Sequence, residues 1–153
     1  NQYLAFVAKK ELDKIPIFGT IIRTAGFVLV DRGNNKEAIK SLESLKLDMY
    51  KYPRSVGIFP EGTRTKNGKL QDFKKGAAVL GIDTALPIVP VAIIGSYSWL
   101  NRSFFAKEPN VITVAFGSPI ETKNSVYEDR NDITMKIKKQ IVKLIKWLKI
   151  NII

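Results

Sequence analysis

Short apolar segments alternate with helix-forming segments along this chain, and no other feature of the sequence constrains the fold as strongly. Strand-like apolar runs occur at residues 3–8, 27–30, 55–59, 87–94 and 110–116. Helical spacing of apolar residues occurs at residues 16–25, 35–50 and 74–82. Strands that alternate with helices predict an α/β fold with a mostly parallel central sheet flanked by helices.

The length and the hydrophobic content fit one globular domain. A chain of 153 residues can bury a sizeable core, and a hydrophobic content of 45% is too high for a disordered chain. We therefore expect a single domain over residues 1–153. Because residues 1–8 enter a strand-like pattern without a lead-in, we also expect the N-terminal part of that domain to be missing from this sequence.

The sequence contains neither cysteine nor histidine. The absence of cysteine excludes disulfides, thiolate nucleophiles and sulfur-ligated metals. The absence of histidine removes the commonest general base at neutral pH and the commonest metal ligand. We expect no metal site in these residues.

The formal net charge of +11 comes from 25 Lys and Arg against 14 Asp and Glu. Such an excess favours anionic partners: nucleic acid, an anionic membrane surface or phosphorylated substrates. The basic residues are scattered or confined to one helix, and no RNP, zinc or helix-turn-helix signature occurs. We therefore predict no nucleic-acid partner.

Two of the expected strands end in charged turns that contain glycine. One turn is Asp31-Arg32-Gly33 and the other is Pro60-Glu61-Gly62-Thr63-Arg64. Ligands of parallel sheets bind at the carboxyl ends of the strands. If these strands are neighbours, Arg32 and Arg64 converge on one mouth, where their guanidinium groups match phosphate oxygens.

Three motifs together resemble one enzyme family. Phe59-Pro60-Glu61-Gly62-Thr63-Arg64 resembles the FPEGTR signature of the glycerolipid acyltransferases, the 1-acylglycerol-3-phosphate (lysophosphatidic acid) acyltransferase family. A second region of that family is similar to residues 9–32, through Lys9-Lys10-Glu11-Leu12, Ile15-Pro16, Gly19 and residues 26–32. Its fourth motif resembles residues 89–93.

The resemblance implies a phosphate-binding site. In the family pattern Arg64 binds the substrate phosphate, Arg32 contacts the phosphate or the acceptor, and Glu61 contacts the region of the glycerol hydroxyl. The other implied residues are Gly62 for close backbone approach, Thr63 as a hydroxyl donor, Asp31 as the partner that orients Arg32, and Lys9 in preference to the adjacent Lys10. Each of these residues also fits a structural role in a turn, a strand end or a surface ion pair.

The family's first motif, Asn-His followed by four residues and Asp, does not occur here. Its imidazole takes the proton of the attacking hydroxyl, and its aspartate orients that imidazole. Glu61 is a weak substitute because cations such as Arg64 favour its charged form. We expect this chain, truncated before the catalytic motif, to be inactive by itself.

The implied function is acyl transfer from acyl-CoA or acyl-acyl carrier protein to 1-acyl-glycerol 3-phosphate, giving phosphatidic acid in phospholipid biosynthesis. The resemblance implies no cofactor, and it implies membrane association on the cytoplasmic side, since the lysophospholipid substrate lies in the bilayer. Glycerol 3-phosphate or another lysolipid is an alternative acceptor. A non-catalytic phosphate- or phospholipid-binding module is the alternative from a different class.

Residues 131–153 predict a basic amphipathic C-terminal helix, and this pattern leaves two interpretations open. The helix fits attachment to an anionic bilayer, and it fits equally a helix that packs on the sheet with a solvated lysine face. Similarly, Trp99, Phe104 and Phe105 fit a membrane-facing surface or an ordinary core. Pro90 is predicted to lie in the core.

Overall fold

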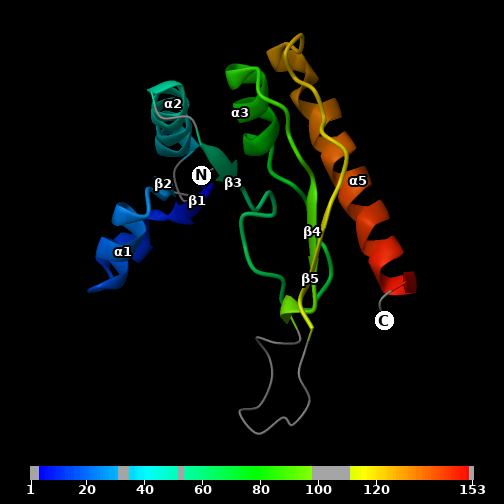
Figure 1. Cartoon of the computed structure of the whole chain (residues 1–153). Coiled ribbons are helices and arrows are strands. Elements are labelled where there is room, and N and C mark those ends of the chain that lie inside the picture. The colour runs from blue at the N-terminus through cyan, green and yellow to red at the C-terminus, as the bar shows by residue number, and fades with distance from the viewer. Residues whose placement is uncertain (1–3, 31–34, 52–53, 98–110, 152–153) are drawn as a thin grey trace, which may run out of the picture. The chain divides into compact units, whose positions relative to one another are not determined.

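The structure, a computed structural model, describes residues 4–30, 35–51, 54–97 and 111–151. The chain divides into two compact units, Asn1–Gly62 and Thr63–Ile153 (Figure 1). Each unit is described by itself below. The single domain over residues 1–153 stays a prediction.

The first unit is built on three parallel strands. Its elements are β1 (Leu4–Lys9), the 3₁₀ helix η1 (Lys10–Lys14), α1 (Phe18–Thr24), β2 (Val28–Val30), α2 (Asn35–Lys51) and β3 (Ser55–Gly57). The strand order is β2-β1-β3, and both pairs are parallel. The parallel sheet predicted from the alternating pattern is therefore confirmed in this unit.

A small core holds these strands and helices together. Ala5 of β1, Val30 of β2 and Leu45 of α2 are buried, which fixes α2 against β2. The ring of Phe6 lies with its centroid 6.1 Å from that of Phe59. A Cβ atom at Gly57 would come within 2.5 Å of the Phe6 ring. Glycine at this position of β3 therefore leaves room for the Phe6 ring.

The segment between β1 and β2 depends on one glycine. A Cβ atom at Gly19 would lie 2.1 Å from the carbonyl oxygen of Asp13, so only glycine lets α1 approach η1 this closely. Asp13 also forms an ion pair with Arg23 of α1. The 3₁₀ helix η1 spans five residues, which is too short to show helical periodicity in the sequence.

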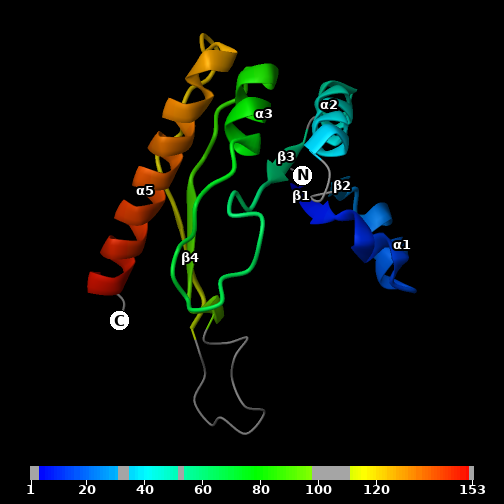
Figure 2. The ribbon, with the colours of Figure 1, turned by 180° about the vertical axis from the view of Figure 1, so that it is seen from behind.

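The second unit combines two helices with an antiparallel strand pair. Its elements are α3 (Gly76–Thr84), β4 (Val91–Ile94), β5 (Thr113–Phe116), the 3₁₀ helix η2 (Tyr127–Asp129) and α5 (Arg130–Asn151). Figures 1 and 2 show α3 and α5 beside β4 from opposite sides. β4 and β5 pair antiparallel, with Ala92 opposite Ala115. This antiparallel pair stands beside the parallel strands of the first unit in a fold predicted to be mostly parallel.

The core of this unit lies along α5. Ile133, Ile137, Ile141 and Leu148 are buried against Ala78 of α3 and Ala92 of β4. The lysines at positions 136, 139, 143, 146 and 149 are exposed. The apolar side of the predicted amphipathic helix is therefore used for packing, and its lysine face is solvated.

Close packing explains why a glycine stands inside α3. A Cβ atom at Gly81 would lie 2.6 Å from Cδ1 of Ile88. Pro90 is among the fully buried residues, which confirms its predicted core role. Trp99, Phe104 and Phe105 lie outside the described residues, so their two interpretations stay open.

Candidate functional site

The first part of the Phe59–Arg64 motif forms a tight turn after β3. The N–H of Gly62 donates to the carbonyl oxygen of Phe59 at 3.0 Å. Gly62 has φ 66°, in the left-handed region that glycine adopts without strain. Glu61 inside this turn is half-buried. The backbone thus holds Glu61 just beyond the carboxyl end of β3.

The carboxyl ends of the three strands in the first unit share one edge. Lys9 is the last residue of β1 and lies opposite Val30, the last residue of β2. Parallel pairing places the turn with Glu61 at the same edge of the sheet. The structure therefore brings Lys9 and Glu61 to the predicted edge.

Lys9 is exposed and makes a local ion pair. Its Nζ atom lies 3.0 Å from Oε1 of Glu11. The hydrogen bond from Lys9 holds the pKa of the Glu11 carboxyl below its ordinary value. Asp31 and Arg32 follow Val30 in the sequence but lie outside the described residues, so their roles and the convergence of Arg32 with Arg64 stay predictions.

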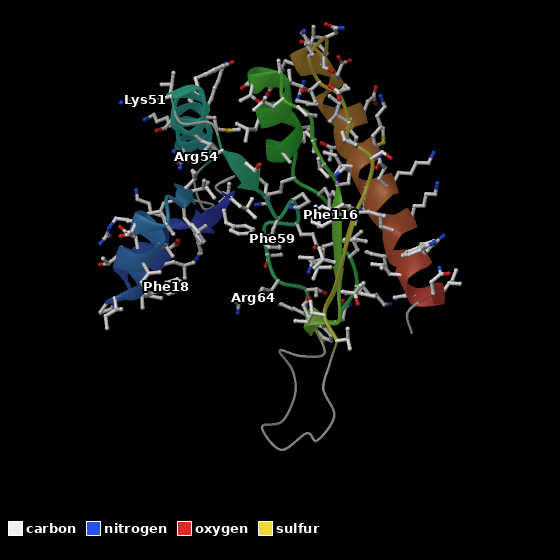
Figure 3. All side chains as sticks on the ribbon, viewed as in Figure 1. Phe18, Lys51, Arg54, Phe59, Arg64 and Phe116 are labelled. Carbon is white, nitrogen blue, oxygen red and sulfur yellow. The ribbon has the colours of Figure 1, made fainter. Side chains whose placement is uncertain are left out.

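Thr63 and Arg64 open the second unit, at the start of what we call the Arg64 loop, residues 63–71. This loop surrounds a pocket of about 340 Å³ lined by Thr63, Arg64, Lys66, Asn67, Lys69, Leu70 and Gln71. Three of these side chains are cationic and none is a carboxylate. Within the described part of the second unit, no carboxylate forms an ion pair with Arg64. Figure 3 labels the Arg64 side chain. The pocket is therefore electropositive and suits a small anion.

Hydrogen bonds inside the Arg64 loop fix its shape. The hydroxyl of Thr65 donates to the carbonyl oxygen of Lys69 at 2.9 Å. The N–H of Lys69 donates to Oδ1 of Asn67 at 3.1 Å, and Gly68 takes φ 73° at the tip. Nε2 of Gln71 donates to the carbonyl oxygen of Arg64 at 3.4 Å. The main chain that carries Arg64 is thereby closed into a compact loop.

Sequence reasoning missed the residues that organise this loop and the two lysines that line it. The Asn67-Gly68 pair is a local turn signal within this loop, because Asn and Gly tolerate the conformations that turns require. Nothing local marked Tyr97, whose hydroxyl donates to the carbonyl oxygen of Lys66 at 2.9 Å. Lys66 and Lys69 could have been found from the density of cations around Arg64.

Two further properties bear on the chemistry. Within the ranges that the structure describes, no group of three or more His, Cys, Asp and Glu side chains is placed to hold a metal ion. In the same ranges, none of the helices has the length and apolarity needed to cross a bilayer.

Known proteins that resemble this chain in sequence belong to one family. The family model described as Acyltransferase matches residues 1–94. The chain is 39% identical over 116 residues to the 1-acyl-sn-glycerol-3-phosphate acyltransferase of Cocos nucifera, covering 76% of this chain and 38% of that protein. It is 30% identical over 141 residues to the 1-acyl-sn-glycerol-3-phosphate acyltransferase of Saccharomyces cerevisiae, covering 91% of this chain and 46% of that protein.

A solved structure shows the same fold. The crystal structure of the 1-acyl-sn-glycerophosphate (LPA) acyltransferase PlsC from Thermotoga maritima superposes with a TM-score of 0.74 at 26% identity, covering 95% of this chain and 56% of that one. The chain thus spans between 38% and 56% of the length of these relatives. The motifs, the α/β fold and the comparisons lead to one conclusion: this chain belongs to the acyltransferase family.

Proposed function

We propose that this chain supplies the acceptor-binding part of an enzyme that transfers a fatty acyl group to 1-acyl-glycerol 3-phosphate and forms phosphatidic acid. The observation that carries the proposal is the electropositive pocket around Arg64, directly after the Phe59–Gly62 turn. The names of the similar proteins support 1-acyl-glycerol 3-phosphate as the acceptor. Acyl-CoA or acyl-acyl carrier protein is the proposed donor.

In the proposed reaction the acceptor hydroxyl attacks the thioester carbonyl carbon and loses its proton to a general base. The carbon–sulfur bond then breaks, and the thiol of the donor leaves. Arg64 would hold the acceptor phosphate through two parallel N–H···O bonds, and Lys9 and Arg32 would add positive charge. Fixing the phosphate in this way positions the hydroxyl, and positioning contributes a large part of enzymatic rate enhancement.

The turn before Arg64 has its own proposed part. Glu61 would accept a hydrogen bond from the glycerol moiety, Gly62 would let the ligand approach the backbone, and Thr63 would donate its hydroxyl. The half-buried position of Glu61 and the exposure of Thr63 support these roles. The chain contains no histidine, so we infer that the general base comes from outside these 153 residues and that the isolated chain binds the acceptor without turning it over.

We also propose that the chain works at the cytoplasmic surface of a membrane. The net charge of +11 and the exposed lysines of α5 support an anionic surface as partner. The buried apolar stripe of α5 argues for electrostatic contact in place of insertion.

The test is phosphatidic acid formation from 1-oleoyl-glycerol 3-phosphate and oleoyl-CoA. The natural gene product that contains these residues should form phosphatidic acid, and Arg64→Ala should raise its KM for the acceptor. The isolated chain should form none. No phosphatidic acid from the natural gene product would overturn the proposed activity, and a robust rate from the isolated chain would overturn the inference about the general base.

A non-catalytic phospholipid-binding module is a second candidate, favoured by the absence of histidine from this sequence. The same assay separates the two candidates. A natural gene product that binds 1-oleoyl-glycerol 3-phosphate but transfers no acyl group from either donor would establish this second function.

A further inference from the structure

We propose that Tyr97 is a positioning residue for the Arg64 site. Its contacts with Lys66 and Gly68 hold the Arg64 loop against the segment that follows β4, and we call these two contacts the latch. This inference rests on the proposed function, since it assigns Tyr97 a part in binding the acceptor phosphate. Nothing in the motif pattern of the family singled out this tyrosine.

Two contacts join Tyr97 to the loop. Its hydroxyl donates to the carbonyl oxygen of Lys66 at 2.9 Å, across 31 positions of sequence. Its ring lies beside Gly68, where an added Cβ atom would come 3.1 Å from Cδ1 of the ring. Gly68 also has φ 73°. Close approach of the ring and a left-handed backbone therefore both favour glycine at the tip of the loop.

Tyr97 is well placed to anchor the loop because it follows a strand fixed in the core. Ala92 of β4 is 1% exposed and belongs to the buried cluster along α5. Tyr97 comes three positions after Ile94, the last residue of that strand. The hydrogen bonds of Thr65 and Asn67 close the loop on itself, whereas the Tyr97 hydroxyl connects it to this fixed part of the unit.

The latch acts on the charges of the pocket. The carbonyl oxygen of Lys66 accepts the hydrogen bond from the Tyr97 hydroxyl. Lys66 also lines the pocket, together with Arg64 and Lys69. A free loop would have to lose conformational freedom when it gathers these cations around a phosphate, and that loss weakens binding. A latched loop has already lost much of this freedom. We therefore expect tighter binding of the phosphate with the latch than without it.

The experiment measures Kd for 1-hexanoyl-glycerol 3-phosphate by isothermal titration calorimetry on the chain and on four variants. Tyr97→Phe removes the hydroxyl that bonds to Lys66 and keeps the ring. Gly68→Ala places a methyl group against that ring. Arg64→Ala removes the proposed phosphate ligand. Tyr127→Phe is the matched control, because this exposed tyrosine belongs to the same unit and does not line the pocket.

We expect Tyr97→Phe to weaken binding by about two- to tenfold, as the loss of one neutral hydrogen bond implies. Gly68→Ala should weaken it at least as much, and Tyr127→Phe should leave it unchanged. In the natural gene product, Tyr97→Phe should raise the KM for the acceptor and leave kcat unchanged, which general loss of stability would not do.

The outcomes separate the latch from the proposed function. If Arg64→Ala weakens binding while Tyr97→Phe and Gly68→Ala bind as tightly as the parent chain, the latch is wrong and the phosphate site stands. If Arg64→Ala binds as tightly as the parent chain, the phosphate site is wrong, and the latch falls with it.

Discussion

Arg64 is the residue on which the proposed chemistry depends most. Replacing it with lysine keeps the charge but removes the planar fork that holds two phosphate oxygens. We expect Arg64→Ala to weaken binding of 1-hexanoyl-glycerol 3-phosphate by about ten- to hundredfold, the usual range for a lost hydrogen bond to a charged group. Arg64→Lys should fall between that variant and the parent chain. Arg130→Ala, at an arginine that does not line the pocket, is the control, and an equal loss in that variant would show that the effect comes from net charge.

Gly62 of the same motif has a backbone conformation that favours glycine. Its φ of 66° is unfavourable for residues with a Cβ atom. We expect Gly62→Ala to reduce the free energy of unfolding by about 1–2 kcal/mol, measured by urea denaturation. Thr63→Ala, at the next and exposed position, should change stability by less than about 0.5 kcal/mol. Equal stability of the two variants would mean that the turn tolerates a side chain at residue 62.

At the scale of elements, α5 supplies most of the core of the second unit. Ile137 is 4% exposed in that core, so Ile137→Ala should cost about 2–5 kcal/mol of unfolding free energy. Lys139 on the exposed face should tolerate alanine within about 0.5 kcal/mol. Thermal and urea unfolding of both variants measure the difference. Similar stabilities for the two variants would contradict the packing of α5 described above.

One ion pair links α5 to the segment that precedes α3. Nζ of Lys138 lies 2.7 Å from Oδ1 of Asp72, and this hydrogen bond holds the pKa of Asp72 below its ordinary value of 3.8. A lowered carboxyl pKa gives stability that is present above the ordinary value and is lost as pH falls through the lowered one.

Asp72→Asn should therefore lower the melting temperature slightly at neutral pH. The gap between variant and parent should narrow as pH falls below 3.8, and also as salt concentration rises. Melting curves across pH, with Glu128→Asn as an exposed control, provide the test. A gap that stays constant down to the acid limit of folding would assign the effect to something other than this ion pair.

The elements that sequence predicted best are those with the longest periodic patterns. The helix predicted over residues 35–50 spans Asn35–Lys51, and the C-terminal helix spans Arg130–Asn151. The 3₁₀ helix η1 was missed because five residues show no helical repeat. The antiparallel pairing of β4 and β5 was missed because strand polarity depends on partners distant in sequence. The same limit hid Tyr97, whose contact with the Arg64 loop leaves no local signature.

At the scale of the whole molecule, the net charge of +11 is the dominant property. We expect the chain to bind vesicles that contain phosphatidic acid and to leave neutral phosphatidylcholine vesicles unbound. Replacing Lys136, Lys139, Lys143 and Lys146 with glutamine should reduce that binding at least about tenfold, since a lysine near an anionic surface contributes about 1 kcal/mol. Co-sedimentation at low and raised salt measures it. Binding that survives both the substitutions and raised salt would require a hydrophobic anchor elsewhere in the chain.

The proposed function depends on recognition of the phosphate of a lysophospholipid acceptor by this chain. Calorimetric titration of the chain with 1-hexanoyl-glycerol 3-phosphate and with 1-hexanoylglycerol tests it directly, because the two ligands differ only in the phosphate. We predict saturable binding of the phosphorylated ligand and at least about tenfold weaker binding of the other, from the loss of charge-assisted hydrogen bonds. Equal affinity for the two ligands would show that the chain does not recognise the phosphate.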